Sequence, residues 1–265
     1  MNEDEVLRQV RDGDRHRGGF RCLRLFRLEG AAFGALRADV LALAQDRVGS
    51  LVASPGHVTN WTGPFGEVRQ LSLLNASGRV DDFSSDHDGS IFGKRFHLAS
   101  SCPSLAAFVG AFPHAVNFRV GILGPRSGLS AHEEHALIRM QDGSVGARLR
   151  LHLPIVTTPE AELVLDGDVH HLEEATVYFV NHGCVHEASN GGDRPRIHLN
   201  WDVLLTRETY DLLFGDAEVP QGWVRVPQEE WSPEPRERRS VGDYRRLPPL
   251  VTPAEAARAS LCEVQ

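Results

Sequence analysis

The chain has 265 residues, of which 41% are hydrophobic and 24% charged, and its formal net charge is −8 at pH 7. This composition is typical of a soluble globular protein that buries a sizeable core, and the acidic balance argues against a nucleic-acid partner, which needs a basic surface. Because the sequence shows neither an N-terminal signal sequence nor an apolar run of about 18 residues, we expect a cytoplasmic protein without membrane contact.

The composition along the chain predicts its domain organisation. Residues 1–20 are charged and polar and are expected to form a flexible N-terminus. Residues 21–205 are expected to form one domain that begins with α/β elements. Residues 206–265 are rich in Pro, Glu and Arg, and we expect an extension that wraps the surface or is partly disordered. The four cysteines lie far apart without a C-x-x-C pair, which predicts free thiols.

The first half of the chain is predicted to mix strands and helices. Arg21–Leu28 and Val68–Leu74 are expected to be strands. From Gly30 to Gln45 apolar residues recur at helical spacing, which predicts an amphipathic helix. A second helix is expected over Pro103–Phe112, because proline is favoured in a first helical turn.

The second half is predicted to be mainly β. Short runs of strand-forming residues alternate with turn signals, which is typical of an antiparallel sandwich or jelly roll. The expected strands are Val116–Leu123, Ala147–Ile155, Ala161–Val164, Val169–Leu172, Thr176–Val180 and Arg196–Leu205.

Two of these strands carry an unusual alternation of cationic and apolar residues. Side chains alternate between the two faces of a strand. In the run 148–155 the arginines and a histidine therefore share one face, and leucines share the other. The run 196–203 repeats the pattern, with Arg, His, Asn and Asp on its polar face. This arrangement predicts strands that line a polar, anion-binding cavity.

A candidate metal site is predicted from His132, Glu134 and His186. His132 and Glu134 are two residues apart and lie on one face of an extended segment, while His186 follows much later in the chain. Two histidines and a carboxylate on one side of a metal form the facial triad of non-haem Fe(II) oxygenases. The H-x-E pair is common by chance, so a surface role for His132 stays open on this motif alone.

Arg196 strengthens the metal hypothesis by its position. It stands ten residues beyond His186, after a glycine-rich turn and at the start of a strand with a polar face. A 2-oxo dicarboxylate that chelates iron needs a buried cation for its far carboxylate, and arginine offers a two-pronged contact that lysine cannot match.

Several ordered motifs together resemble one family. They are His132-x-Glu134, Arg148-Leu-Arg-Leu-His-Leu-Pro154, Val185-His186, and Arg196-Ile-His-Leu199 with Asp202. In type, order and spacing they are similar to the aspartyl/asparaginyl β-hydroxylase family, and most similar to its bacterial branch, which includes free-proline hydroxylases. The resemblance covers residues 116–203 and extends more faintly to residues 66–78.

The resemblance implies a mainly β fold, a double-stranded β-helix (jelly roll, cupin-like) with flanking helices, and the cofactors Fe(II) and 2-oxoglutarate. It implies a dioxygenase that uses O₂ to hydroxylate a C–H bond of an amino acid, whether free, peptidyl or carrier-bound. The competing hypothesis is a jelly-roll metal-binding protein without oxygenase activity, acting as a sensor or isomerase. The implied site residues are His132, Glu134 and His186 at the iron, Arg196 at the distal carboxylate of 2-oxoglutarate, and Arg150 and His152 near its other carboxylate.

The sequence departs from the family pattern in two places. The bacterial branch usually has H-x-D, so Glu134 is one methylene longer, and the interval from Glu134 to Arg148 is longer than usual. His135 lacks a carboxylate two residues later and is a weaker ligand candidate than His132. The sequence also leaves open a role for His182 as a donor to substrate. We expect His170 and His171 to be ordinary strand residues, and Arg148 could be a surface salt-bridge residue. Asp86–Gly89 is expected to be a solvated turn instead of a calcium loop.

Overall fold

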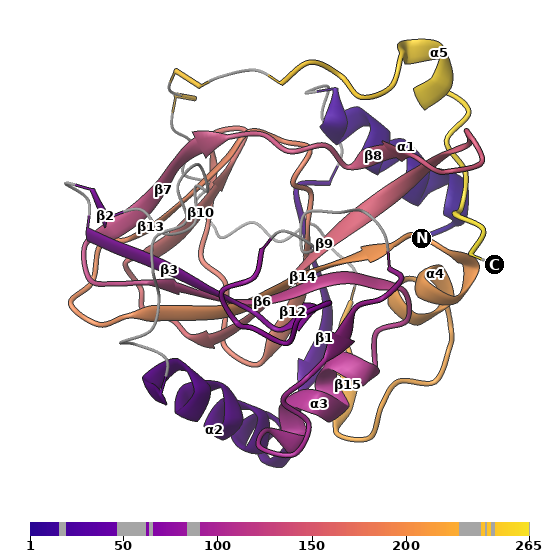
Figure 1. Cartoon of the computed structure of the whole chain (residues 1–265). Helices are drawn as coiled ribbons and strands as arrows, with labels where there is room; N and C mark the ends of the chain where they lie inside the picture. Colours follow the sequence, from indigo (N-terminus) through magenta and orange to yellow (C-terminus); the bar gives the residue numbers. More distant parts are fainter. Residues whose placement is uncertain are drawn as a thin grey trace.

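The computed structural model describes residues 1–15, 20–46, 62–63, 66–83, 91–227, 240–241, 243–244 and 247–264. Figure 1 shows the arrangement of the chain, in which strands form two packed sheets and helices cover the outside. The turn predicted at Asp86–Gly89 lies outside the described residues. The helices are α1 (Glu3–Asp14), α2 (Gly30–Asp46), α3 (Pro103–Gly110), α4 (Arg207–Leu213) and α5 (Pro253–Ala256).

The larger sheet of the described chain is 9-stranded, with the order β15-β1-β12-β9-β14-β6-β3-β2 and with β8 paired to β9. Its pairings are antiparallel, so the predicted antiparallel β class is confirmed. Its strands are β1 (Cys22–Leu28), β2 (Thr62–Gly63), β3 (Gly66–Ser72), β6 (Ala115–Leu123), β8 (Leu137–Arg139), β9 (Val145–Val156), β12 (Thr176–Val180), β14 (Arg196–Leu204) and β15 (Trp223–Arg225).

The smaller sheet has the order β11-β10-β13-β7 and packs against one face of the larger sheet. This pair of antiparallel sheets is the jelly-roll architecture that the sequence predicts. Apolar residues from both sheets, among them Leu163, Tyr178 and Val180, form a small core between them. The strands are β7 (Ser127–His132), β10 (Ala161–Leu165), β11 (Asp168–His170) and β13 (His186–Asn190), and a separate two-stranded pair is formed by β4 (Leu74–Asn75) and β5 (Arg95–Phe96).

The predicted alternation along β9 and β14 decides which face of the larger sheet is apolar. The leucines of β9 and Leu199 and Trp201 of β14 belong to the main hydrophobic core, together with residues of α2 and α3. Trp201 stacks on Phe118 of β6 with ring centroids 4.9 Å apart. The two helices therefore cover one face of the sheet, and the polar residues of β9 and β14 are left to face the smaller sheet.

The N-terminus differs from the sequence-based expectation of a flexible segment over residues 1–20. Residues 3–14 form α1, which begins after Asn2, whose side chain accepts a hydrogen bond from the backbone N–H of Glu5 at 2.8 Å. Val6 and Val10, four residues apart, are buried in the main core. The sequence of this segment contains an N-cap residue and an apolar pair at helical spacing, both of which favour a helix. The many charged residues around them favoured the prediction of a flexible segment instead.

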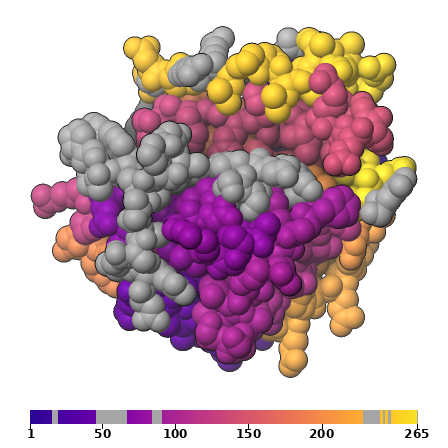
Figure 2. Space-filling view, viewed as in Figure 1, coloured from indigo at the N-terminus to yellow at the C-terminus, as the bar shows by residue number. Residues whose placement is uncertain are grey.

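The C-terminal extension is anchored by contacts that composition does not predict. Cys262 is buried and donates its backbone N–H to Leu205 at 2.8 Å. Glu255 accepts a 2.8 Å hydrogen bond from Arg139. Figure 2 shows the described part of this segment, in yellow, lying along the surface at the top of the view. In the described chain no helix is long and apolar enough to cross a membrane.

Candidate metal centre and its cavity

His132 and His186 lie directly opposite each other in the smaller sheet. His132 is the last residue of β7, His186 is the first residue of β13, and the antiparallel register pairs the two. Side chains of paired residues point to the same face of a sheet. The ring centroids are 4.2 Å apart, so two residues far apart in the chain form one side of a site.

The backbone orients both imidazole rings in the same way. Nδ1 of His132 lies 2.8 Å from the carbonyl oxygen of Ser130, and Nδ1 of His186 lies 2.9 Å from that of Cys184. Because a carbonyl only accepts, each Nδ1 carries the proton and donates, and each Nε2 keeps its lone pair for a metal. Burial, followed by the charge of His132, lowers the pKa of His186 to about 3, so this ring is neutral at pH 7.

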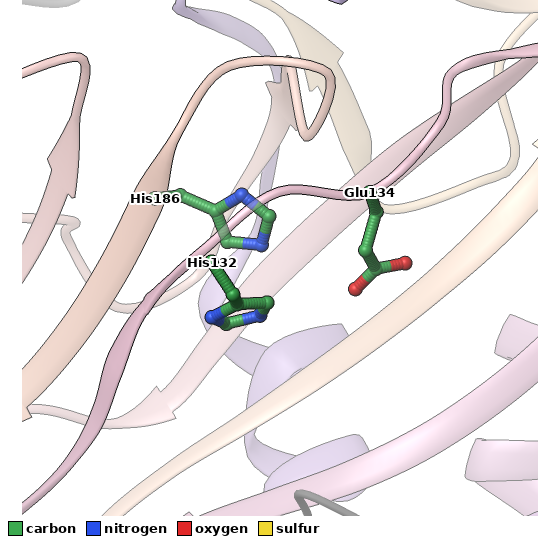
Figure 3. A group of neighbouring side chains, drawn as sticks. All are labelled: His132, Glu134 and His186. Carbon is green, nitrogen blue, oxygen red and sulfur yellow. The ribbon is translucent and has the colours of Figure 1, made fainter. Parts of the chain in front are cut away.

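Glu134 completes a group of three possible ligands. One ligand atom from each of His132, Glu134 and His186 lies within 4.8 Å of the others. Figure 3 shows the two rings and the carboxylate bordering one space. Among the described residues, these three are the metal-binding side chains that lie close enough together to share one ion, and we call them the metal group. Two imidazole nitrogens and one carboxylate oxygen are the donor set of non-haem Fe(II) sites, so the residues fit the metal that the sequence implies.

Arg150 holds the carboxylate of Glu134 in a two-pronged contact. Its Nη1 donates to Oε1 of Glu134 at 2.7 Å, and its Nη2 donates to Oε2 at 2.9 Å. Arg148 adds a weaker bond to the same Oε2 at 3.3 Å. Burial alone would raise the pKa of the Glu134 carboxyl, but the charges of Arg150, His182 and Arg148 together outweigh burial and hold the pKa well below its usual range. The carboxylate is therefore ionised and oriented before any metal binds.

The other side of Arg150 is bound by Asp202, which has no solvent exposure. Nε and Nη2 of Arg150 donate to its two carboxylate oxygens at 2.7 and 2.9 Å. Asn117 donates to Asp202 at 2.7 Å. Arg150 thus makes four hydrogen bonds with its five N–H groups. A contact of Arg150 with cosubstrate stays a prediction, whereas its contact with Glu134 is a feature of the structure.

All six predicted site residues line one cavity of about 720 Å³ between the two sheets. The polar face of β9 contributes Arg150 and His152, and the polar face of β14 contributes Arg196, His198 and Asn200. The cavity predicted from the alternation of these two strands is therefore present. The smaller sheet contributes the apolar side chains of Leu129, Leu163 and Ala188, and β12 of the larger sheet contributes Val180.

Arg196 is a buried cation that lines this cavity. Only 6% of its surface is exposed, and its side chain has no hydrogen bond or ion pair with any residue that the structure describes. Burial alone lowers its pKa to about 10, which leaves the guanidinium charged at pH 7. Leaving a buried charge unpaired is costly, so this position is suited to an anion that enters the cavity.

The remaining histidines separate into cavity residues and others. His182 lines the cavity, and its Nε2 lies 3.3 Å from Nη2 of Arg148. His135, the weaker ligand candidate, is not part of the lining or of the metal group, and neither are His170 and His171 on the β11 side. Arg148 is not a surface salt-bridge residue, because it pairs with the buried Asp202 at 3.5 Å and is 13% exposed.

Sequence reasoning missed the lining residues from the C-terminal extension. Asp243, Tyr244 and Leu247 border the cavity, and the backbone N–H of Leu247 donates to Glu133, the neighbour of Glu134. No local pattern in the sequence indicates this contact, because it depends on where a non-repetitive segment crosses the finished domain.

Comparison with known families confirms the resemblance that the motifs predict. Residues 91–205 match the model of the family described as Aspartyl/Asparaginyl beta-hydroxylase. The matched segment includes all six predicted site residues. No curated protein sequence matches the chain.

Solved structures with a similar fold are distant. A salicylate 1,2-dioxygenase variant from Pseudoaminobacter salicylatoxidans, in complex with gentisate, is 16% identical with a TM-score of 0.34, covering 63% of this chain and 32% of that one. This chain thus spans about a third of the length of that relative. The carbocyclase SnoK from nogalamycin biosynthesis, described as non-heme and alpha ketoglutarate dependent, is 13% identical with a TM-score of 0.42, covering 77% and 84%. A 2OG-Fe(II) oxygenase family protein from Burkholderia pseudomallei is 12% identical with a TM-score of 0.34, covering 61% and 77%.

Proposed function

We propose that this chain, whose residues 91–205 match the aspartyl/asparaginyl β-hydroxylase family, is an Fe(II)- and 2-oxoglutarate-dependent dioxygenase. Its reaction would hydroxylate a C–H bond of an amino acid that is free, peptidyl or carrier-bound. In this proposal His132, Glu134 and His186 would hold the iron, which as a three-ligand site would still be able to bind cosubstrate and O₂.

The observation that carries the proposal is Arg196 in the same cavity as the metal group. A metal-binding protein without oxygenase activity needs only the triad, and a buried cation without a partner would be an unnecessary cost to it. A 2-oxo dicarboxylate needs both features, because one end chelates the metal and the other end carries a charge. Arg196 lines the cavity and is 6% exposed, so its guanidinium suits the distal carboxylate of 2-oxoglutarate.

Bound iron and 2-oxoglutarate supply the oxidising chemistry, in which O₂ is consumed, succinate and CO₂ are released, and a hydrogen of the substrate is replaced by hydroxyl. The residues of the chain orient the metal ligands and exclude water. The carbonyls of Ser130 and Cys184 bind Nδ1 of each histidine, so that each Nε2 would be free to hold the metal. Arg150 fixes Glu134, and the apolar wall near Leu163 and Val180 limits the water beside the reacting atoms.

The amino-acid substrate is supported by the family description and by the size of the cavity. The family is described by its action on aspartyl and asparaginyl residues. A volume of about 720 Å³ is in the range of small-molecule sites and leaves room beside a cosubstrate for one amino-acid side chain. His152 is placed by the proposal beside the second carboxylate of the cosubstrate, and Arg150 reaches it with its remaining N–H.

The proposal is tested by following O₂ consumption and succinate release by protein loaded anaerobically with Fe(II). Uptake is expected only with 2-oxoglutarate, and one of the twenty amino acids or their short peptides is expected to accelerate it. His186→Ala is the matched inactive control. Metal binding without any 2-oxoglutarate-dependent uptake would favour the competing metal-binding sensor or isomerase.

A further inference from the structure

His198 is a cavity residue to which the proposed function gives no role. It is two residues after Arg196 on β14, so the two side chains share the polar face of the strand. His198 is 2% exposed, and neither of its ring nitrogens has a hydrogen-bond partner among the described residues. Buried polar atoms almost always have partners, and a histidine with two orphan nitrogens is therefore suited to a ligand.

The neighbours of His198 on the polar face of the sheet are small or polar. On β6 its partner in the register is Gly121, which adds no side chain to this face. A methyl group at Gly121 would lie 3.1 Å from Oδ1 of Asn200, so the floor of the cavity is narrow here. Beyond Gly121 on β3 stands Gln70, whose buried Oε1 also has no partner in the described chain.

The charge around His198 is positive and favours an anion. Burial, and then the charge of Arg196, hold the pKa of His198 well below its usual range, so the ring is neutral and has one N–H to donate. His152 lies edge-on with ring centroids 6.0 Å apart, and the same two causes hold its pKa low, so it is neutral as well. A neutral imidazole donor beside a buried guanidinium matches a carboxylate, which accepts several hydrogen bonds.

We propose that His198 donates its ring N–H to the carboxylate that Arg196 binds, so that the two residues together form the seat for the distal end of the cosubstrate. The inference rests on the proposed function and adds a second binding residue to it. His198 is thus a determinant of selectivity for a dicarboxylate over a 2-oxo monocarboxylate.

The test compares 2-oxoglutarate with pyruvate, which has the 2-oxo acid end but no distal carboxylate. Binding is measured by calorimetry on protein loaded with Mn²⁺ in place of iron, so that no turnover occurs. His198→Phe should weaken 2-oxoglutarate binding by about ten- to a hundredfold, the effect of a hydrogen bond to a charged group, and leave pyruvate binding unchanged. His198→Gln, which keeps an N–H donor, should recover part of the loss and also serves if the Phe variant does not fold.

The matched control is His170→Phe, which removes an equally buried histidine that is 1% exposed and outside the cavity. It should bind both ligands as the wild type does. Equal effects of His198→Phe on 2-oxoglutarate and pyruvate, or no effect on either, would overturn the inference. Failure of the proposed function shows differently, because the wild-type protein itself would then have no preference for 2-oxoglutarate.

Discussion

Asp202 and Arg150 form the most deeply buried charge pair of the site, joined by hydrogen bonds of 2.7 and 2.9 Å. The same guanidinium binds Glu134, so the position of a metal-ligand candidate depends on a carboxylate that never touches the metal group. Residues that orient ligands often matter nearly as much as the ligands themselves.

Asp202→Asn should therefore destabilise the protein and weaken metal binding together. Removing one partner of a buried pair leaves an undercompensated charge, and we expect a loss of about 3 kcal/mol in the free energy of unfolding. Chemical denaturation measures this loss, and calorimetry with Mn²⁺ measures the metal affinity. Asp81→Asn, which removes the partner of the exposed Arg79, is the control with a much smaller expected loss. Unchanged stability and metal binding in Asp202→Asn would contradict the positioning role.

The same pair predicts a dependence of stability on pH. Burial alone would raise the pKa of the Asp202 carboxyl, but the charges of Arg150 and Arg148 hold it well below its usual range. A carboxyl with a lowered pKa stabilises the fold above its unfolded pKa of about 3.9, and the contribution is lost as the pH falls below that value. Unfolding measured between pH 5 and pH 2 should show a steeper loss below about pH 4 in the wild type than in Asp202→Asn. Parallel curves would mean that Asp202 does not contribute.

His186→Ala and His132→Ala should each abolish turnover and weaken metal binding, because either change leaves two protein ligands. His135→Ala is the matched control, since His135 is near in sequence but is not part of the metal group. It should keep most of the activity. Calorimetric titration with Mn²⁺ distinguishes the variants, and wild-type affinity in His186→Ala would show that this ligand assignment is wrong.

The N-terminal helix gives a prediction independent of the metal. A side chain at Gly13, on the buried side of α1, would overlap with the carboxamide of Asn181, which itself donates to the backbone of Gln9 at 3.2 Å. Gly13→Ala should cost about 1–3 kcal/mol, as overpacking usually does. Gly34→Ala in α2, where nothing lies within 4 Å, should be neutral or stabilising. Equal melting temperatures of the two variants would mean that α1 does not pack against Asn181.

Much of the fold was predictable because its signals are local. Alternation along β9 and β14 depends only on which residues are apolar, and it correctly separated the helix-covered face from the cavity face. The proximity of His132, Glu134 and His186 was also predictable, because the residue types and their order are visible in the sequence. His132 and His186 come together only through the pairing of β7 with β13, which the motif implied and the register supplies.

The remaining features depend on tertiary contacts that leave no local pattern. The double pairing of Arg150 with Glu134 and Asp202 needs three segments in one place, and an arginine on a polar face gives no indication of how many partners it has. The crossing of the C-terminal extension over the cavity at Leu247 is another case. Helix α1 was missed because a charged composition concealed a short apolar stripe.

The most direct measurement compares 2-oxoglutarate and pyruvate binding to the wild type and to Arg196→Ala, on Mn²⁺-loaded protein. If Arg196 binds the distal carboxylate, its loss costs about 3–5 kcal/mol, which is roughly two to four decades in 2-oxoglutarate affinity. Arg196→Lys should recover only part, because a point charge does not replace the guanidinium fork. Pyruvate should bind the wild type and Arg196→Ala alike, so the loss of Arg196 and the loss of the distal carboxylate should be strongly coupled. Additive effects, with no coupling between Arg196 and the distal carboxylate, would contradict the assignment and place the cosubstrate anchor elsewhere, with Arg150 as the next candidate.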